Sequence, residues 1–300
     1  MKKFLPRRSA LYVPGSNKRA LEKAPLLNAD LLIIDLEDSV APSSKELARN
    51  LISTMDLRRQ HDYQSTIVRI NSLKSEWGGL DISAIANLNI DGILIPKIED
   101  ASMVTTSEEI ISDLIGECYP NIWLMMETPK AILNAHTIAA ASKRIEGLIM
   151  GTTDLHKELH AYPSKNRDAM ITSMGLCLLA ARAEGLIALD GVHMNLDDDE
   201  GFIHACNHGR ILGFDGKTLI HPKTIDQANR IFSPKDEDLN RAKRIIKAHK
   251  EAEMEGKGVT VLDGTLIEAL HVSESKRLLA LNEIISKKIN PEESNSTVID

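Results

Sequence analysis

The chain has 300 residues, of which 43% are hydrophobic and 26% are charged, and its net charge is −7. A chain of this size and composition can bury the core of one large α/β domain or of two domains. Its mixed, slightly acidic charge excludes a general nucleic-acid binder, which would carry a basic stripe.

The cysteines and the N-terminal residues bear on the compartment. Cys118, Cys177 and Cys206 lie far apart, without the spacing of a metal or redox site, so we expect reduced thiols in a cytoplasmic protein. The first residues lack the apolar segment of a signal peptide, and no apolar run approaches the length of a membrane span. We therefore expect no membrane and no nucleic-acid partner.

Short apolar runs that end in polar residues predict β-strands along most of the chain. They lie at 9–15, 31–38, 65–71, 91–99, 121–128, 147–154, 186–193 and 213–222. Amphipathic segments between them predict helices, at 18–29, 44–55, 80–88, 101–115, 129–142, 171–185 and 200–212. Near-continuous apolar strands that alternate with helices indicate a parallel sheet covered on both faces.

The number and spacing of these units predict how the sheet closes. Eight strand–helix units over residues 1–232 match a TIM (β/α)₈ barrel, an α/β fold. A doubly wound open sheet is the alternative. The even spacing of the strands favours the barrel, and no G-x-G-x-x-G follows a strand, which weakens a dinucleotide-binding interpretation.

The pattern changes after residue 232. Residues 233–258 begin with acids, continue with basic residues and end in glycines, which is typical of a capped helix. A short extended piece and another helix follow. We therefore expect a C-terminal helical extension or lid over 233–288, and a disordered polar tail at 289–300.

Polar residues close most of the predicted strands, and in a TIM barrel the active site lies at those strand ends. They are Asp35, Glu37, Asp38, Arg69, Asn71, Lys97, Glu99, Glu127, Asp154, Asp215, Lys217 and His221. So many carboxylates in one cleft are unfavourable unless a cation lies among them. Carboxylates from different strands, without a Cys or His cluster, favour Mg²⁺.

These residues divide into predicted roles. Glu127 and Asp154, on adjacent strands, are the predicted direct ligands of Mg²⁺. The acids at 35, 37 and 38 would hold metal-bound waters. Arg69 has the fork geometry to bind a substrate carboxylate. We expect Lys97 to pair with nearby acids rather than to take part in the chemistry.

Several stretches of the chain resemble the citrate lyase β-subunit / malyl-CoA lyase family, a branch of the HpcH/HpaI aldolases. They are RSALYVPGS, DLEDSV, VRIN, PKIE, MMET, GTTDL, LGFDGKTLIHPKTI and VLDGTLIEA. The resemblance runs from about residue 7 to residue 280. It implies a TIM barrel, a homotrimer or larger homo-oligomer, and Mg²⁺-dependent cleavage of a C–C bond in a 3-hydroxy acyl thioester.

The resemblance also implies roles for single residues. Arg69 matches the substrate-binding arginine, and Glu127 and Asp154 match the metal ligands. Tyr12 and Lys23 match positions that contact coenzyme A.

Asp263 matches an aspartate that reaches the active site of a neighbouring subunit. Two positions depart from the pattern: Thr153 stands where relatives often have an acid, and Asn17 where malyl-CoA lyase can have an arginine. The first departure affects the tuning of the metal site rather than metal binding.

The function predicted from the sequence is a lyase that cleaves malyl-CoA or citramalyl-CoA to acetyl-CoA and glyoxylate or pyruvate. A general acid then protonates the enolate; Asp263 is the first candidate, and Glu37 or Asp38 is the other. The alternatives are a malyl-CoA thioesterase, a citrate lyase β-subunit acting on a carrier-protein thioester, and a metal-binding barrel without turnover. A single methyl in the substrate pocket lies beyond what the sequence resolves.

Overall fold

The computed structural model describes residues 5–55, 63–162 and 164–289. The chain divides into two compact units, a larger one over Arg7–Phe232 and a smaller one built on the residues from Ser233 onward. None of the described helices is long and apolar enough to cross a membrane.

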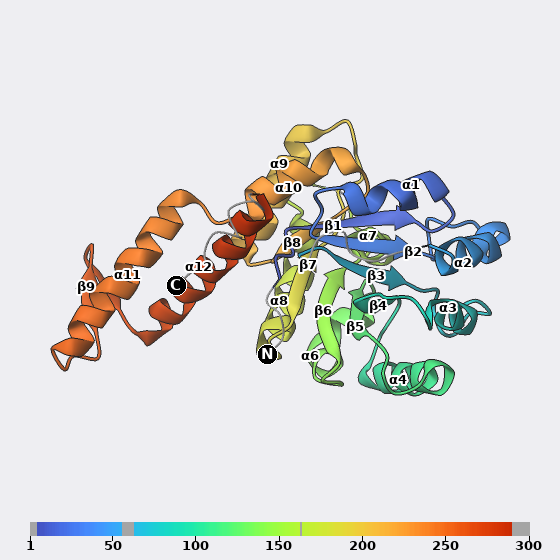
Figure 1. The fold of residues 1–300 in the computed structure, drawn as a ribbon, viewed down its shortest axis with the longest axis horizontal. Helices are drawn as coiled ribbons and strands as arrows, with labels where there is room; N and C mark the ends of the chain where they lie inside the picture. Colours follow the sequence, from blue (N-terminus) through green and yellow to red (C-terminus); the bar gives the residue numbers. More distant parts are fainter. Residues whose placement is uncertain (1–4, 56–62, 163, 290–300) are drawn as a thin grey trace, which may run out of the picture. The chain divides into compact units, whose positions relative to one another are not determined.

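The larger unit is a closed barrel of eight parallel strands in sequential order (Figure 1). The strands are β1 (Ser9–Pro14), β2 (Leu31–Asp35), β3 (Ser65–Arg69), β4 (Gly92–Ile95), β5 (Asn121–Met126), β6 (Ile145–Met150), β7 (Ile187–Asp190) and β8 (Gly216–Leu219). β1 pairs with both β2 and β8, which closes the ring. The predicted TIM barrel is therefore confirmed, and each strand lies within or beside its predicted run.

Helices follow the strands around the barrel. They are α1 (Lys18–Lys23), α2 (Lys45–Ser53), α3 (Gly78–Ile85), α4 (Ala101–Ile115), α5 (Pro129–Leu133), α6 (Ala135–Ala139), α7 (Thr152–Glu158), α8 (Ile171–Ala183), α9 (Asp199–Leu212) and α10 (Ile225–Phe232). Short 3₁₀ turns are η1 (Ala24–Leu26), η2 (Pro42–Ser44), η3 (Asp168–Met170) and η4 (Pro222–Thr224).

Two local features differ from the prediction. The single helix expected over 129–142 is broken at Asn134, which ends α5 and begins α6 while its side-chain amide donates to the Glu99 carbonyl. The helices α7 and α10 were not predicted. α7 is short, and only Gly151 separates it from β6. The predicted strand run over 147–154 therefore included its first residues.

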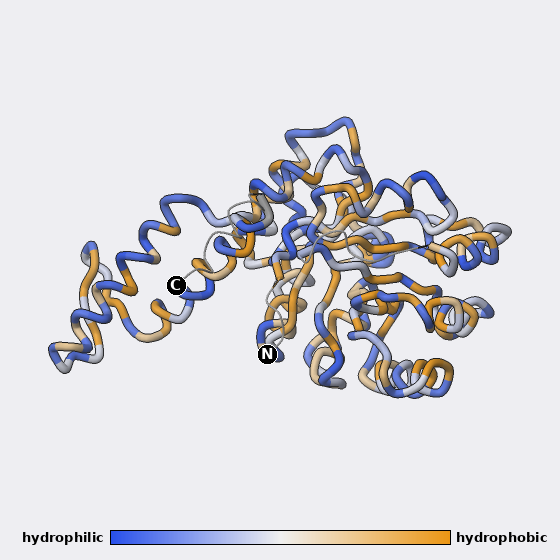
Figure 2. The backbone as a smooth tube through the Cα atoms, in the orientation of Figure 1, coloured by the Kyte–Doolittle hydropathy of each residue, from blue (hydrophilic) through white to orange (hydrophobic). Residues whose placement is uncertain are grey.

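Alternate residues of each strand face the barrel interior and the surrounding helices. The interior holds a small cluster with Trp123 at 0% exposure, and the outward residues join the large core beneath the helices. Figure 2 shows hydrophobic stretches along the barrel strands. Gly92 and Gly147 flank Trp123: an added Cβ would lie 2.8 and 2.4 Å from its ring atoms, so the indole leaves room for glycine alone.

The smaller unit contains α11 (Asp236–Met254), the hairpin β9 (Thr260–Leu262) and β10 (Thr265–Ile267), and α12 (Ala269–Ile289). Ile245, Ile267 and Val272 form its apolar cluster. The C-terminal helices are thus as predicted, and residues 290–300 of the predicted disordered tail lie outside the described residues. Asp263 and Gly264 form the hairpin turn with φ of 51° and 76°, as Asp-Gly favours in two-residue hairpins.

Candidate active site

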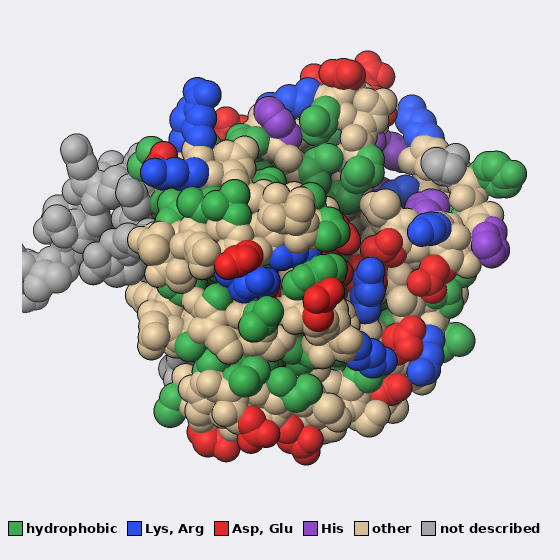
Figure 3. Space-filling model, turned by 90° about the vertical axis from the view of Figure 1, so that its right-hand side faces the viewer, with side chains coloured by type: hydrophobic (Ala, Val, Ile, Leu, Met, Phe, Trp, Pro, Cys, Tyr) green, Lys and Arg blue, Asp and Glu red, His purple; other side chains and the backbone are tan. Residues whose placement is uncertain are grey.

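The predicted site residues from β1 to β6 meet at the carboxyl ends of the strands. Figure 3 views the molecule from the side toward which the arrows of β1, β2 and β3 point in Figure 1, and acidic and basic side chains lie next to one another on this face. The strand register explains the gathering, because Asp35 pairs with Arg69 as the last residues of β2 and β3.

Arg69 is buried and fixed by Asp35. Its Nε and Nη2 donate to the two carboxylate oxygens at 2.7 and 2.8 Å, a bidentate pair. Asp35 also accepts the backbone N–H groups of Glu37 and Ser39. Burial would raise the pKa of Asp35, but Arg69 and these hydrogen bonds outweigh it and hold the pKa below its usual value. Asp35 therefore orients Arg69, where the sequence suggested a partner for metal-bound water.

Nη1 is the guanidinium nitrogen of Arg69 that points toward the other acids. It lies 3.2 Å from Glu37 Oε2 and 3.6 Å from Asp38 Oδ2. Beneath the guanidinium lies the ring of Tyr12, with 4.8 Å between Arg69 Cζ and the ring centroid. Nη1 is therefore the guanidinium nitrogen of Arg69 that Asp35 does not engage.

Glu37 is a buried carboxylate that lies within ion-pair distance of Arg69 and of Lys97, with 3.7 Å between its Oε1 and Lys97 Nζ. Its loop is held by Lys45, whose ammonium donates to the carbonyls of Leu36 and Glu37 at 2.7 Å. Its Oε2 makes no hydrogen bond with any described residue, although Arg69 Nη1 is within ion-pair distance. Burial raises the pKa of Glu37 to about 7; Arg69 opposes the shift and Asp38 adds to it.

Glu127 directly follows β5 and is 1% exposed. Its Oε1 accepts the backbone N–H of Lys97 at 2.7 Å. A Cβ on Gly151 would lie 2.3 Å from Glu127 Cβ and 2.8 Å from Oε2, so only glycine fits beside it. Burial raises the pKa of Glu127 to about 8, and the charges of Glu37 and Asp154 add to the shift.

Asp154 lies in the first turn of α7, just beyond β6, and is partly buried. Its charge acts on both Glu127 and Lys97. Within residues 5–55, 63–162 and 164–289, no group of three or more His, Cys, Asp or Glu side chains could hold a metal ion by itself. Mg²⁺ needs only one or two carboxylates and keeps several waters. Buried carboxylates in excess over cations, with an oxygen that lacks a hydrogen bond, fit such an ion.

In the last predicted strand run, over 213–222, the sequence assigned Asp215 and His221 to the cleft, and the structure places them differently. Asp215 precedes β8, where it accepts the backbone N–H of Ala188 and pairs with Arg182. It therefore lies at the amino ends of the strands. His221 is exposed and accepts the N–H of Lys223 at the start of η4. The sequence run gave no sign of where the strand within it began.

Lys217 belongs to a buried ion cluster that the sequence did not predict. Its ammonium donates to Asp190 Oδ2 at 2.9 Å and to the Gly191 carbonyl. Arg167 donates to both oxygens of Asp190 at 2.8 and 2.7 Å. Asp190 is the last residue of β7 and pairs in register with Lys217 of β8. Arg167 also donates to the carbonyl of Ala205 in α9, so the cluster lies between the barrel and a surrounding helix. The pairing of Asp190 with Arg167, far away in the chain, carries no local signal.

Lys23 and Asp263 are the residues for which the family resemblance implied contacts with coenzyme A and with a neighbouring active site. Lys23 is exposed in the last turn of α1. Asp263 belongs to the smaller unit, where its Oδ1 accepts a hydrogen bond from Arg244 Nη2 at 2.6 Å.

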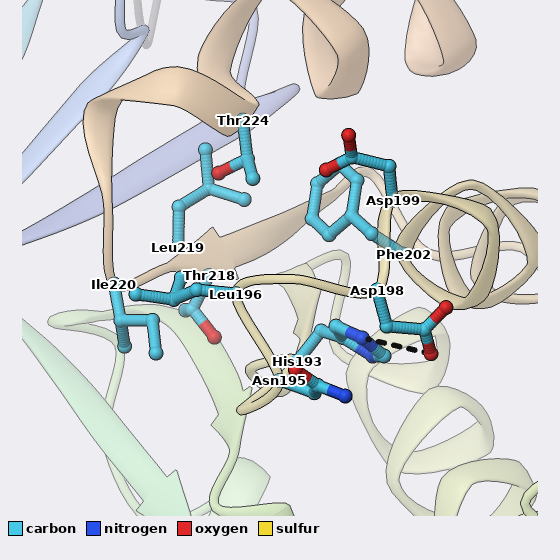
Figure 4. Close-up of a pocket in the computed structure, with 10 residues that line it drawn as sticks. All are labelled: His193, Asn195, Leu196, Asp198, Asp199, Phe202, Thr218, Leu219, Ile220 and Thr224. Carbon is cyan, nitrogen blue, oxygen red and sulfur yellow. Dashed lines mark ion pairs between the residues drawn. The ribbon is translucent and has the colours of Figure 1, made fainter.

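A pocket opens elsewhere on the barrel, beside the ends of β7 and β8 (Figure 4). His193 points toward Asp198 there, with 3.6 Å between Nε2 and Oδ2. Asp198 already caps α9 through the N–H of Gly201, and Asp199 pairs with Lys223. We assign the chemistry to the acids near β2 to β6 instead, because the buried charged groups without full compensation are there.

The chain is similar to known proteins over most of its length. The family model described as HpcH/HpaI aldolase/citrate lyase matches residues 8–222. A (3S)-malyl-CoA thioesterase of Cereibacter sphaeroides is 45% identical over 94% of this chain and 96% of its own length. Citrate lyase subunit beta of Haemophilus influenzae is 35% identical over 91% and 96%. The structure of CitE from Mycobacterium tuberculosis with magnesium, acetoacetate and coenzyme A has a TM-score of 0.77 and 27% identity, and covers 94% of this chain and 100% of that one.

Proposed function

Because the chain belongs to the HpcH/HpaI aldolase/citrate lyase family, we propose that it is a Mg²⁺-dependent thioesterase that hydrolyses malyl-CoA or a close relative. The observation that carries this proposal is a pair of buried carboxylates near Arg69, Glu37 and Glu127, whose pKa values are raised by burial. The sequence favoured a C–C lyase as the main function. The 45% identical thioesterase supports the alternative better.

Each residue of the site has a proposed role that follows from its position. Glu127 and Asp154 would hold Mg²⁺, and the CitE complex named above contains magnesium. When bound, Mg²⁺ acts as a Lewis acid that polarises a substrate oxygen. Arg69 offers Nη1 to the substrate carboxylate, since Asp35 occupies its other two nitrogens.

Glu37 is the proposed base for the attacking water. With a pKa of about 7 it is partly deprotonated at neutral pH, and its Oε2 is available to accept a proton. The water oxygen bonds to the thioester carbon, the C–S bond breaks, and the proton leaves with the thiolate as free coenzyme A. The other product is the free hydroxy diacid.

A lyase remains the second candidate, because the same groups serve it. Glu37 would then take the proton of the substrate hydroxyl, the C–C bond would break, and Asp263 would protonate the enolate. The citrate lyase β-subunit is favoured by the 35% identical relative and would need a carrier-protein thioester. A homotrimer or larger assembly and a cytoplasmic location stay proposals, which light scattering and fractionation would test.

Product analysis tests the proposal. Purified protein is incubated with Mg²⁺ and (3S)-malyl-CoA or citramalyl-CoA, and free thiol, oxo acid and acetyl-CoA are quantified. We expect one malate for each free coenzyme A, without glyoxylate. Glyoxylate or pyruvate formed one-for-one with acetyl-CoA would establish the lyase instead. No product from either substrate would contradict both. EDTA and the Glu127→Gln variant are the blanks.

A further inference from the structure

Tyr12 lies at the centre of the site, in a place that its sequence position does not reveal. It belongs to β1, and its side chain packs against the interior cluster of the barrel while remaining partly exposed. Its ring lies 4.8 Å beneath Arg69 Cζ. Its hydroxyl donates to Met125 Sδ at 3.5 Å. Met125 precedes Glu127 by two residues on the same side of β5. Tyr12 thus lies beneath both the cationic and the acidic side of the site.

We propose that Tyr12 is a positioning residue whose ring holds the Arg69 guanidinium in the orientation that presents Nη1 to the substrate carboxylate. The inference rests on the proposed function for its substrate, and on the structure for the contact. It assigns Tyr12 to the acid-binding end of the substrate, whereas the family resemblance implies a contact with coenzyme A.

Two contacts, the pair with Asp35 and the Tyr12 ring, restrict the Arg69 guanidinium in different directions. The bidentate pair with Asp35 fixes two nitrogens within the plane of the guanidinium. Such a pair resists sliding, but tilting out of the plane is opposed only by contacts on the faces. The Tyr12 ring covers one face, and its negative quadrupole attracts a desolvated cation. Nη1 therefore stays directed toward Glu37 and Asp38.

The ring rather than the hydroxyl carries this role. A thioether is a weak acceptor, so the hydrogen bond to Met125 contributes little. Phenylalanine would preserve the ring beneath Arg69, and leucine would replace the ring with a smaller apolar side chain. Comparison of the two variants therefore distinguishes a positioning role of the ring from an acid–base role of the phenol.

The first experiment uses kinetics and product inhibition. Tyr12→Leu and Tyr12→Phe are compared with wild type for KM and kcat with malyl-CoA, and for inhibition by free malate and by free coenzyme A. We expect Tyr12→Leu to raise the malate inhibition constant about 5- to 30-fold and to leave that of coenzyme A unchanged. Tyr12→Phe should restore malate affinity to within about threefold of wild type.

A matched control is available at the other end of the barrel. Tyr119 is buried and lies 4.2 Å from Arg144 Cζ, a contact of the same kind away from the site. Tyr119→Leu should lower the melting temperature without changing malate inhibition. Weaker coenzyme A inhibition in Tyr12→Leu, or equal losses in Tyr12→Leu and Tyr12→Phe, would overturn the inference.

A double-mutant cycle keeps this test independent of the proposed function. Tyr12→Leu is combined with Arg69→Lys, which removes the planar group, and the four melting temperatures are measured without substrate. The inference requires Tyr12→Leu to cost clearly less in the Arg69→Lys background. Additive effects would refute it. If wild type turns over neither thioester, the proposed function fails and the cycle still decides the contact.

Discussion

The backbone of Lys97 fixes the side chain of Glu127: Lys97 N donates to Glu127 Oε1 at 2.7 Å. Lys97 itself adopts a left-handed conformation, with φ of 54°. For a residue with a Cβ this conformation costs on the order of 1 kcal/mol. The hydrogen bond from Lys97 engages Oε1 of Glu127 and leaves Oε2 for a cation.

Glu127→Gln should separate the effect of the buried charge on stability from its effect on activity. We expect activity to fall by about 100-fold or more, since the amide is a poor ligand for Mg²⁺. The metal-free variant should melt above metal-free wild type near pH 8, because it buries no charge. Glu99→Gln is the control: Glu99 pairs with Lys130 and should leave activity within about twofold. A metal-free variant that melts lower than wild type would contradict the view of Glu127 as an uncompensated charge.

The metal-free protein should lose stability as the pH rises. The folded-state pKa values of Glu127 and Glu37, about 8 and about 7, lie above the ordinary 4.5, so the folded state binds more protons in between. The free energy of unfolding therefore falls from about pH 4.5 to about pH 8. Mg²⁺ should raise the melting temperature more at about pH 8.5 than at about pH 5. Equal Mg²⁺ effects at both pH values, measured by scanning fluorimetry against EDTA, would speak against this.

Gly151→Ala tests whether crowding at Glu127 matters. The added methyl would lie 2.3 Å from Glu127 Cβ, so the carboxylate must shift. We expect Mg²⁺ affinity to fall at least about tenfold and stability to drop by about 1–3 kcal/mol. Gly175→Ala in α8 is the control, because among the described residues nothing lies within 4 Å of its Cβ. It should stabilise by up to about 1 kcal/mol. Titration calorimetry and chemical denaturation measure both effects.

Asp190→Asn should destabilise the barrel by about 3–5 kcal/mol, because it leaves the buried charges of Arg167 and Lys217 without their partner. Burial opposes ionisation of Asp190, but the two cations outweigh it and lower its pKa below 3.8. Its contribution is thus present above about pH 4 and lost as the pH falls through the lowered pKa. Glu274→Gln, at an exposed pair with Arg277, should change stability by less than about 0.5 kcal/mol. Similar denaturation midpoints for both variants would be the opposite outcome.

Asp263→Asn tests the predicted acid–base role of the smaller unit. Asparagine tolerates the φ of 51° and can still accept from Arg244, so the hairpin should persist. For the lyase reaction, in which Asp263 would protonate the enolate, we expect turnover to fall about 10²- to 10⁴-fold with unchanged Mg²⁺ affinity. Arg244→Met shows separately what loss of the ion pair costs. Near-normal turnover of Asp263→Asn would contradict an acid–base role for Asp263.

Periodicity and residue type were enough for the barrel and for much of the candidate site. The strands and helices alternate in the chain with a spacing that only a few folds satisfy, and parallel strands bring their carboxyl ends together. Arg69, Glu37 and Glu127 could therefore be picked out as polar residues that follow apolar runs. The structure brings these three together, with Asp154 within electrostatic range of Glu127.

What the sequence by itself determined is the order of the elements and the chemical types at their ends. Only the tertiary structure decided that Asp35 serves Arg69, that the Lys97 backbone holds Glu127, and that Asp215 lies at the opposite strand ends. The same holds for the Asp190 cluster and for Tyr12 beneath Arg69. The physical reason is that these relations depend on strand register, on which face of a strand a side chain takes, and on φ angles that long-range contacts impose. A local pattern of residues carries none of these.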